Sequence, residues 1–85
     1  MIDISYRIFD LVASTNSLTK TAEIVHLTPS AVSHSLRKLE ERLGMQLVVR
    51  NRDGLRLTQY GQELIPHVRY ALKAEERLQQ EIHQI

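Results

Sequence analysis

Apolar residues recur at helical spacing near the start of the chain. Four of them share one helical face: Ile4, Ile8, Leu11 and Val12. Steps of three and four residues return to the same side of a helix with about 3.6 residues per turn, and Phe9 lies at the margin of this face. The pattern predicts a helix over residues 4–14 that ends in the polar sequence STNS.

A short second helix and a longer third helix are predicted after this break. Ser17 is placed as the N-cap of a helix of about two turns, which is marginal without packing against its neighbours. Its apolar positions are Leu18, Ala22 and Val25. The sequence HLTP follows, in which Thr28 and Pro29 favour the N-cap and the first position of the third helix.

Residues 29–43 place an apolar stripe and a polar face on opposite sides of the third helix. The apolar stripe is Val32, Leu36, Leu39 and Leu43. The polar face is Ser30, Ser33, His34 and Arg37. Its short side chains allow close approach to a large partner, and Arg37 and Lys38 follow where cations can reach phosphates or base edges. A solvated helix would also show a polar face, but the order of short helix, turn and longer helix favours helix-turn-helix DNA recognition.

Gly44 suits a left-handed residue at the end of the third helix, and the sequence LVVRNRDGLRLT then predicts a β-hairpin. A three-residue loop, Arg52 to Gly54, would put Arg50 and Arg56 together on the exposed side. It would gather four apolar residues on the other side: Leu47, Val49, Leu55 and Leu57. A two-residue Asp-Gly turn would instead set Arg50 against the leucines. We favour the longer loop, with Asn51 and Arg52 facing outward.

The excess of positive charge is local. The whole chain has a net charge of +1, from 11 Lys and Arg against 10 Asp and Glu, which does not by itself indicate a polyanionic partner. Residues 34–58 hold only three acids but six basic residues: Arg37, Lys38, Arg42, Arg50, Arg52 and Arg56. A hairpin after a helix-turn-helix is a wing, and Arg52 at its tip could enter a narrow minor groove. Arg50 and Arg56 could equally serve solubility and protection of the strand edges.

A single long helix is predicted from its N-cap, Thr58, to the end of the chain, with a bend at Pro66. Seven residues at alternating spacings of four and three form a seam: Leu64, Val68, Ala71, Glu75, Leu78, Ile82 and Ile85. Interrupted only by Glu75, this heptad seam favours homodimerisation through Leu64, Val68, Ala71, Leu78 and Ile82, although it could also pack on the chain's own core. We expect a DNA-binding domain over residues 1–57 and a linker and dimerisation helix over 58–85. Because no capping signal ends this helix, we also expect the chain to be a fragment of a longer protein.

Signals of catalysis are missing from the sequence. It has no Gly-rich phosphate loop, nucleophile motif or paired carboxylates, and its four histidines lack the spacing of a metal site. The absence of cysteine excludes disulfides and thiolate ligands. We therefore expect neither an enzyme nor a cofactor. Without a long apolar run or a signal-peptide pattern, we expect a soluble cytoplasmic protein. The alternative function is a protein-interaction module that uses the C-terminal helix.

Taken together, these residues resemble the N-terminal DNA-binding domain of LysR-type transcriptional regulators. The segment SLTKTAEIVHLTPSAVSHSLRKLEERLGMQLVVRNRDGLRLTQYG is similar to the family's winged helix-turn-helix signature without insertion or deletion. The resemblance implies a mainly α fold of three helices and a two-stranded β-hairpin wing, followed by a long linker helix. It also implies homodimers, or tetramers in a full-length form, on inverted-repeat promoter DNA. A small-molecule effector would bind only a C-terminal domain that this chain lacks.

The resemblance also implies which residues contact DNA. Base-reading positions are Thr28, Pro29, Ser30, Ser33, His34 and Arg37, followed along the helix by Lys38. The wing would contribute Arg50, Arg52 and Arg56, and contacts to the DNA backbone would come from Ser17, Thr19 and Lys20.

Four residues at three places differ from the common family pattern. Pro29 and Ser30 stand where many members carry Gln-Pro, so the amide that reads adenine is absent and base specificity should differ. His34 replaces an arginine, so duplex binding should strengthen at mildly acidic pH, where histidine is protonated. Tyr60 replaces an alanine, and we expect altered packing at the wing exit.

Overall fold

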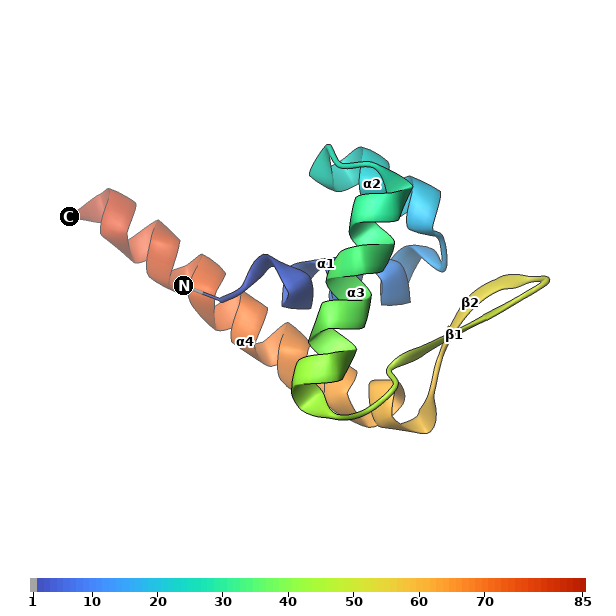
Figure 1. Cartoon of the computed structure of the whole chain (residues 1–85). Helices are drawn as coiled ribbons and strands as arrows, with labels where there is room; N and C mark the ends of the chain where they lie inside the picture. The colour runs from blue at the N-terminus through green and yellow to red at the C-terminus, as the bar shows by residue number, and fades with distance from the viewer. Residues whose placement is uncertain (1) are drawn as a thin grey trace.

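The computed structural model describes residues 2–85, which form helices and one β-hairpin in the predicted order (Figure 1). The elements are α1 (Ile4–Thr15), α2 (Leu18–Val25), α3 (Pro29–Leu43), β1 (Val48–Asn51), β2 (Gly54–Leu57) and α4 (Gln59–Gln84). The mainly α, winged helix-turn-helix fold with a long helix after the wing is therefore confirmed. Residue 1, with which the predicted domain 1–57 begins, lies outside the described residues.

Side-chain caps fix where the helices begin. Ser17, Thr28 and Thr58 each accept a hydrogen bond from the backbone N–H three residues later, as predicted. Asp3 caps α1 in a related way, by accepting from Ser5 N at 2.8 Å. The residues that cap the C-terminal ends of α1, α2 and α3 have left-handed backbones, and Gly44 ends α3 as predicted, with φ of 68°. The corresponding residues after α1 and α2 are not glycines but Asn16 and His26.

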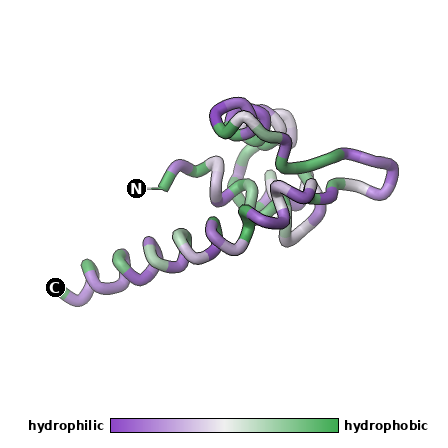
Figure 2. The backbone as a smooth tube through the Cα atoms, turned by 90° about the horizontal axis from the view of Figure 1, so that it is seen from below, coloured by the Kyte–Doolittle hydropathy of each residue, from purple (hydrophilic) through white to green (hydrophobic). Residues whose placement is uncertain are grey.

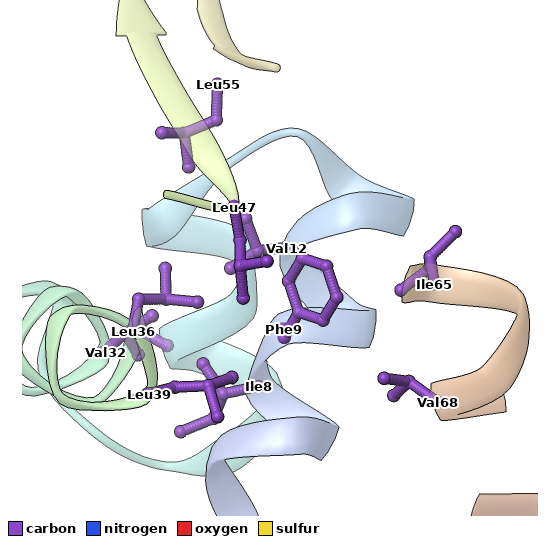
Figure 3. Packing of buried hydrophobic residues seen from close by; sticks show 11 residues of the cluster. Ile8, Phe9, Val12, Val32, Leu36, Leu39, Leu47, Leu55, Ile65 and Val68 are labelled. Atoms are coloured by element: carbon purple, nitrogen blue, oxygen red, sulfur yellow. The ribbon is translucent and has the colours of Figure 1, made fainter. Parts of the chain in front are cut away.

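The hydrophobic core is built around α1, which packs against α2, α3 and α4 (Figure 3). Its buried apolar members are Ile8, Phe9, Val12, Ala22, Val32, Leu36, Leu39, Leu47, Leu55, Ile65 and Val68. The prediction for α1 was partly wrong: Phe9 is fully buried, whereas Ile4 is 55% exposed. Figure 3 shows the Phe9 ring between the rest of the core and the side chains of Ile65 and Val68. Because α1 is covered on two sides, one amphipathic stripe could not describe it.

The predicted register of the hairpin was wrong. β1 and β2 pair antiparallel with Asn51 opposite Gly54, so the turn consists of Arg52 and Asp53 alone. Arg50 lies opposite Leu55, and Arg56 lies opposite Val49. Directly opposed residues share a face of a sheet and alternate residues change face, so Arg50 and Arg56 lie on opposite sides. Val49, expected among the leucines, is 42% exposed and lies with Arg56.

The long helix α4 has a packed half and a free half. Ile65 and Val68 belong to the core, whereas the later turns extend away from the other helices (Figures 1 and 2). The helix is continuous across Pro66. Three hydrogen bonds hold it near the start of the chain. Arg69 donates to Asp10 at 2.8 Å and to Ser14 Oγ at 3.3 Å, and Glu75 accepts from the backbone N–H of Ile2 at 3.0 Å. Part of the predicted seam is thus intramolecular.

Candidate nucleic-acid interface

The outward face of α3 is polar and uncovered within residues 2–85. Val32, Leu36 and Leu39 bury the opposite side of the helix in the core, which fixes the rotation of α3 about its axis. The residues predicted to read bases then fall on the open side. Thr28, Pro29, Ser30, His34, Arg37 and Lys38 are exposed, and Ser33 is half-buried. The burial pattern therefore presents the predicted base-reading residues together.

The start of α2 contributes a second group of polar residues. Thr19 and Lys20 are exposed on its first turn. The Ser17 hydroxyl oxygen caps α2 by accepting from Lys20 N at 3.1 Å. A phosphate near this end would meet the backbone N–H groups of the first turn and the Lys20 side chain.

The wing places its arginines in three different positions. Arg52 is exposed in the turn at the tip of the hairpin. Arg50 reaches back to α3, where its guanidinium donates a hydrogen bond to Ser33 Oγ. Arg56 is exposed on the far side of the hairpin. The structure therefore brings Arg50 to the helix face and leaves Arg52 and Arg56 apart from it.

A hollow lies where α3, the wing and the start of α2 meet. It is lined by Leu18, Ser33, Leu36, Arg37, Gln46, Val48, Arg50 and Leu55. Arg37 of α3 and Arg50 of β1 both line this hollow, although they are far apart in the sequence. Gln46, which the sequence did not indicate, lies here too, and its side-chain amide donates to Val48 O at 3.0 Å. No spacing pattern could have revealed Gln46, because its place depends on how the wing folds back.

Ion pairing removes one basic residue from the predicted cluster. Arg42 donates to Asp3 at 3.2 Å and to Ser5 Oγ at 2.8 Å, and so belongs to the contact between α1 and α3. Hydrogen bonds from the backbone and side chain of Ser5, followed by the Arg42 guanidinium, lower the pKa of Asp3 below its ordinary value. Glu40 is also engaged, because its carboxylate accepts from the backbone N–H of Leu47 at 2.7 Å. The exposed charge left on α3 and the wing is mainly cationic.

Residues 2–85 show no group of three or more acidic or histidine side chains placed to hold a metal ion. Within the same residues, no helix combines the length and the apolar character needed to cross a bilayer. Tyr60, where altered packing was expected, is 58% exposed and lies outside the core.

The chain matches a family described as bacterial regulatory helix-turn-helix protein, lysR family, over residues 5–62. It is 36% identical over 75 residues to the uncharacterized HTH-type transcriptional regulator YvbU of Bacillus subtilis, covering 87% of this chain and 26% of YvbU. It is 43% identical over 56 residues to the HTH-type transcriptional regulator HdfR of Salmonella newport, covering 66% of this chain and 20% of HdfR. The chain thus spans about a quarter or less of these relatives.

Solved structures share this fold. The chain in the complex of the BenM DNA-binding domain with catB site 1 DNA superposes with a TM-score of 0.91 at 24% identity, over 99% of this chain and 94% of that chain. Oxidized OxyR of Corynebacterium glutamicum superposes with a TM-score of 0.87 at 26% identity, over 92% of this chain and 25% of that chain.

Proposed function

Because the chain belongs to the LysR family of bacterial regulatory helix-turn-helix proteins, we propose that it binds double-stranded promoter DNA sequence-specifically as a homodimer. DNA binding in transcription regulation is the function class of this family, and the relatives YvbU and HdfR are both named HTH-type transcriptional regulators. The observation that carries the finer proposal is the open polar face of α3 beside an arginine-bearing wing. We infer a binding role rather than a catalytic one.

In the proposed complex, α3 lies in the major groove. A helix with its side chains is about 10–12 Å across, which matches a major groove about 12 Å wide. Thr28, Pro29 and Ser30 are short and exposed, so the start of the helix can approach the base edges closely. Arg37 follows two turns later, and its guanidinium can bind a guanine or a phosphate in bidentate fashion.

The wing lies near the minor groove in this arrangement. Arg52 at the tip is the residue best placed to enter the groove, since it is exposed in the turn of the hairpin. Thr19 and Lys20 at the start of α2 would contact the sugar-phosphate backbone, because they are exposed at a helix N-terminus. Thus α3 and Arg52 would contact the two grooves, whereas α2 would fix the position of the protein along the DNA.

The exposed turns of α4 support the homodimer. Leu78 is 48% exposed and Ile82 is 51% exposed, although both are large apolar residues at helical spacing. Burying them against a second copy of the same helix would remove this apolar surface from water. A two-fold axis through such a pair would direct the two copies of α3 to an inverted repeat. In a longer protein that contains this domain, we extend the proposal to tetramers and to a small-molecule effector bound outside residues 1–85.

The first test is a titration of duplex affinity against salt. We expect log Kd to change linearly with log salt, with a slope of about 0.9 per phosphate contact, and an inverted repeat to be enriched from a random-sequence pool. Arg37→Glu should weaken binding on the order of a hundredfold, because it replaces a contacting cation with an anion. Lys73→Glu, an exposed charge reversal on α4, is the matched control and should change affinity little.

The second test concerns the dimer. Leu78→Glu with Ile82→Glu should convert a sedimenting dimer to a monomer and favour single half-sites over inverted repeats. Gln80→Glu, exposed on the same helix, should leave the dimer intact. A folded dimer that binds no duplex at low salt would overturn the DNA-binding proposal and favour a protein-interaction role for α4.

A further inference from the structure

Two arginines of the wing differ in the face of the hairpin on which they lie. Arg50 lies opposite Leu55, which is buried against the helices, so Arg50 shares the face turned toward them. Arg56 lies opposite the exposed Val49 and points to the other side. The same type of side chain therefore occurs in two environments within one hairpin, which provides a natural comparison.

The contact of Arg50 is specific. Its guanidinium donates a hydrogen bond to Ser33 Oγ on α3. Within residues 2–85, this is the only hydrogen bond found for the Ser33 hydroxyl. A serine hydroxyl has two lone pairs and one hydrogen, whereas a guanidinium has only donors. Because Ser33 must be the acceptor in this pair, its hydroxyl hydrogen remains available for a different acceptor. Arg50 thus determines how Ser33 can act toward a ligand.

A second tether connects the wing to the same helix. The Glu40 carboxylate accepts from the backbone N–H groups of Leu47 at 2.7 Å and Val48 at 3.3 Å, at the start of β1. Ser33 lies seven residues before Glu40, about 10 Å along the helix axis. β1 is therefore held along α3 at two points, whereas β2 packs on α1 and α4. The Arg50 tether is the one nearer the start of α3, where the polar face is exposed.

The charge and the shape of the surface around the Arg50–Ser33 contact suit DNA. Ser33, Arg37 and Arg50 line the same hollow between α3 and the wing. All three can donate hydrogen bonds there, and the exposed acceptors of DNA are the phosphate oxygens and the purine and thymine edges. A guanidinium already fixed by Ser33 loses less rotamer freedom on binding than a free one.

We propose that Arg50 is a positioning residue for DNA recognition, which orients the Ser33 hydroxyl toward a DNA acceptor and sets the distance between the wing and α3. This proposal rests on the proposed DNA binding. It differs from a minor-groove or solubility role for Arg50, because the residue acts through Ser33 and the major-groove side of the interface.

A double-mutant cycle tests this coupling. The probe is the duplex that the unchanged protein enriches from a random-sequence pool, and the variants are Ser33→Ala, Arg50→Ala and the double variant. Each single change should weaken binding about tenfold, since it removes a hydrogen bond that involves a charged partner. The double variant should lose about as much as one single variant, because the residues act as a unit. Losses that multiply to about a hundredfold would overturn the proposal.

Arg56 supplies the control for charge. Ser33→Ala combined with Arg56→Ala should show multiplied losses, because these residues do not touch. Arg50→Lys keeps the charge but not the planar guanidinium, so the salt slope should persist while the affinity stays reduced. If Arg50→Lys binds as tightly as the unchanged protein, Arg50 acts only as a positive charge that binds phosphate, and the positioning role is rejected.

Selection with Ser33→Ala distinguishes the two sources of the acceptor. If the variant tolerates other bases at one position of the site, the acceptor of the Ser33 hydroxyl is a base edge. If its sequence preference is unchanged but its affinity is lower, the acceptor is a phosphate. Either result supports the orientation of Ser33, provided that the double-mutant cycle shows coupling. Thermal unfolding of every variant checks that it folds. If the unchanged protein binds no duplex, the proposed function fails; if it binds and the cycle is additive, only the role of Arg50 fails.

Discussion

Of the three glycines, Gly61 is the one at which the fold accepts a side chain least readily. It is buried in the first turn of α4, and a Cβ atom there would overlap the backbone carbonyl oxygen of Leu47. Gly44 differs, because it has a left-handed backbone but open space around the position of a Cβ. Gly61 is therefore required because no space is left for a side chain between α4 and the start of the wing. Gly44 is required because the backbone at the end of α3 is left-handed.

We predict that Gly61→Ala lowers the free energy of unfolding by about 1–3 kcal/mol, because backbone atoms must move apart. In a domain of this size that corresponds to a decrease in Tm of roughly 5–20 °C. Gly44→Ala, the control, should cost only about 1 kcal/mol of conformational strain. Equal thermal stability of the two variants would contradict the steric account.

The Asp3 carboxyl gives the second prediction at this scale. Its pKa is lowered from an ordinary value of 3.8, mainly by the backbone N–H of Ser5, so its contribution to stability is complete above that pH. The contribution is lost as the pH falls through the lower pKa of the folded state, because protonation weakens the cap. Asp3→Asn keeps a capping oxygen and removes the titration. Thermal unfolding measured between about pH 5 and about pH 2 should therefore decline less steeply for this variant.

The connection of α1 to α2 depends on the hydroxyl of Thr15. It donates to Ser17 O at 3.1 Å, and its oxygen lies 3.2 Å from Ser17 N and 3.0 Å from Thr21 Oγ1. Since Thr15 has one hydrogen and gives it to Ser17 O, Thr21 must be the donor in the third bond. Thr21 is fully buried, so it has no water to replace this partner.

We expect Thr15→Val to lower the free energy of unfolding by about 1–3 kcal/mol, because it leaves the buried Thr21 hydroxyl unpaired in nearly the same shape. Thr19→Val, on the exposed side of α2, is the matched control and should have a small effect in chemical denaturation. A double variant that also carries Thr21→Val should recover part of the loss. Failure to recover would show that the hydroxyls are not coupled.

Local signals predicted most elements, and distant contacts decided the rest. Ser17, Thr28 and Thr58 act on the backbone three residues away, so short sequence windows identified them. The register of the hairpin depends on Leu47 and Leu55 entering a core formed by residues from every helix, and a short window contains no such information. The burial of Phe9 likewise required Ile65 and Val68 of α4, more than fifty residues later.

In the candidate interface too, local patterns predicted one part and distant contacts decided the other. The exposed residues of α3 followed from helical periodicity, because burial of Val32, Leu36 and Leu39 fixes the rotation of the helix. The contact of Arg50 with Ser33 could not be predicted, since it requires the correct hairpin register and the tether from Glu40. Similarly, Glu75 interrupts the heptad seam at a position where it accepts a hydrogen bond from the backbone N–H of Ile2. The local sequence pattern does not contain this distant contact.

At the scale of the whole molecule, Arg69 links α4 to α1, beside the core contacts of Ile65 and Val68. It donates to Asp10 at 2.8 Å and to Ser14 Oγ at 3.3 Å, both on α1. An exposed ion pair of this kind contributes about 0–1 kcal/mol to stability. Its position matters more, because in the proposed dimer the angle between α4 and the body sets the separation of the two copies of α3.

We predict that Arg69→Ala leaves Tm and dimerisation nearly unchanged but broadens the half-site spacing enriched from a random-sequence pool. The physical reason is that the two copies of α3 must lie about 34 Å apart for one turn of DNA, and a looser α4 permits a wider range. Arg77→Ala, further along the same helix, should retain the original spacing. An identical distribution of spacings for both variants would contradict this role of Arg69.

In the proposed dimer, the exposed last turns of α4 would also couple helix formation to protein concentration. A helical segment of about ten residues without tertiary contacts is marginal in water, so in a monomer the turns around Leu78 and Ile82 should fray. Association would restore them, and mass action then makes the order of this segment depend on concentration. Far-ultraviolet circular dichroism should accordingly show less helical signal per residue on dilution, and amide hydrogen exchange should accelerate in these turns before any other part of the helix.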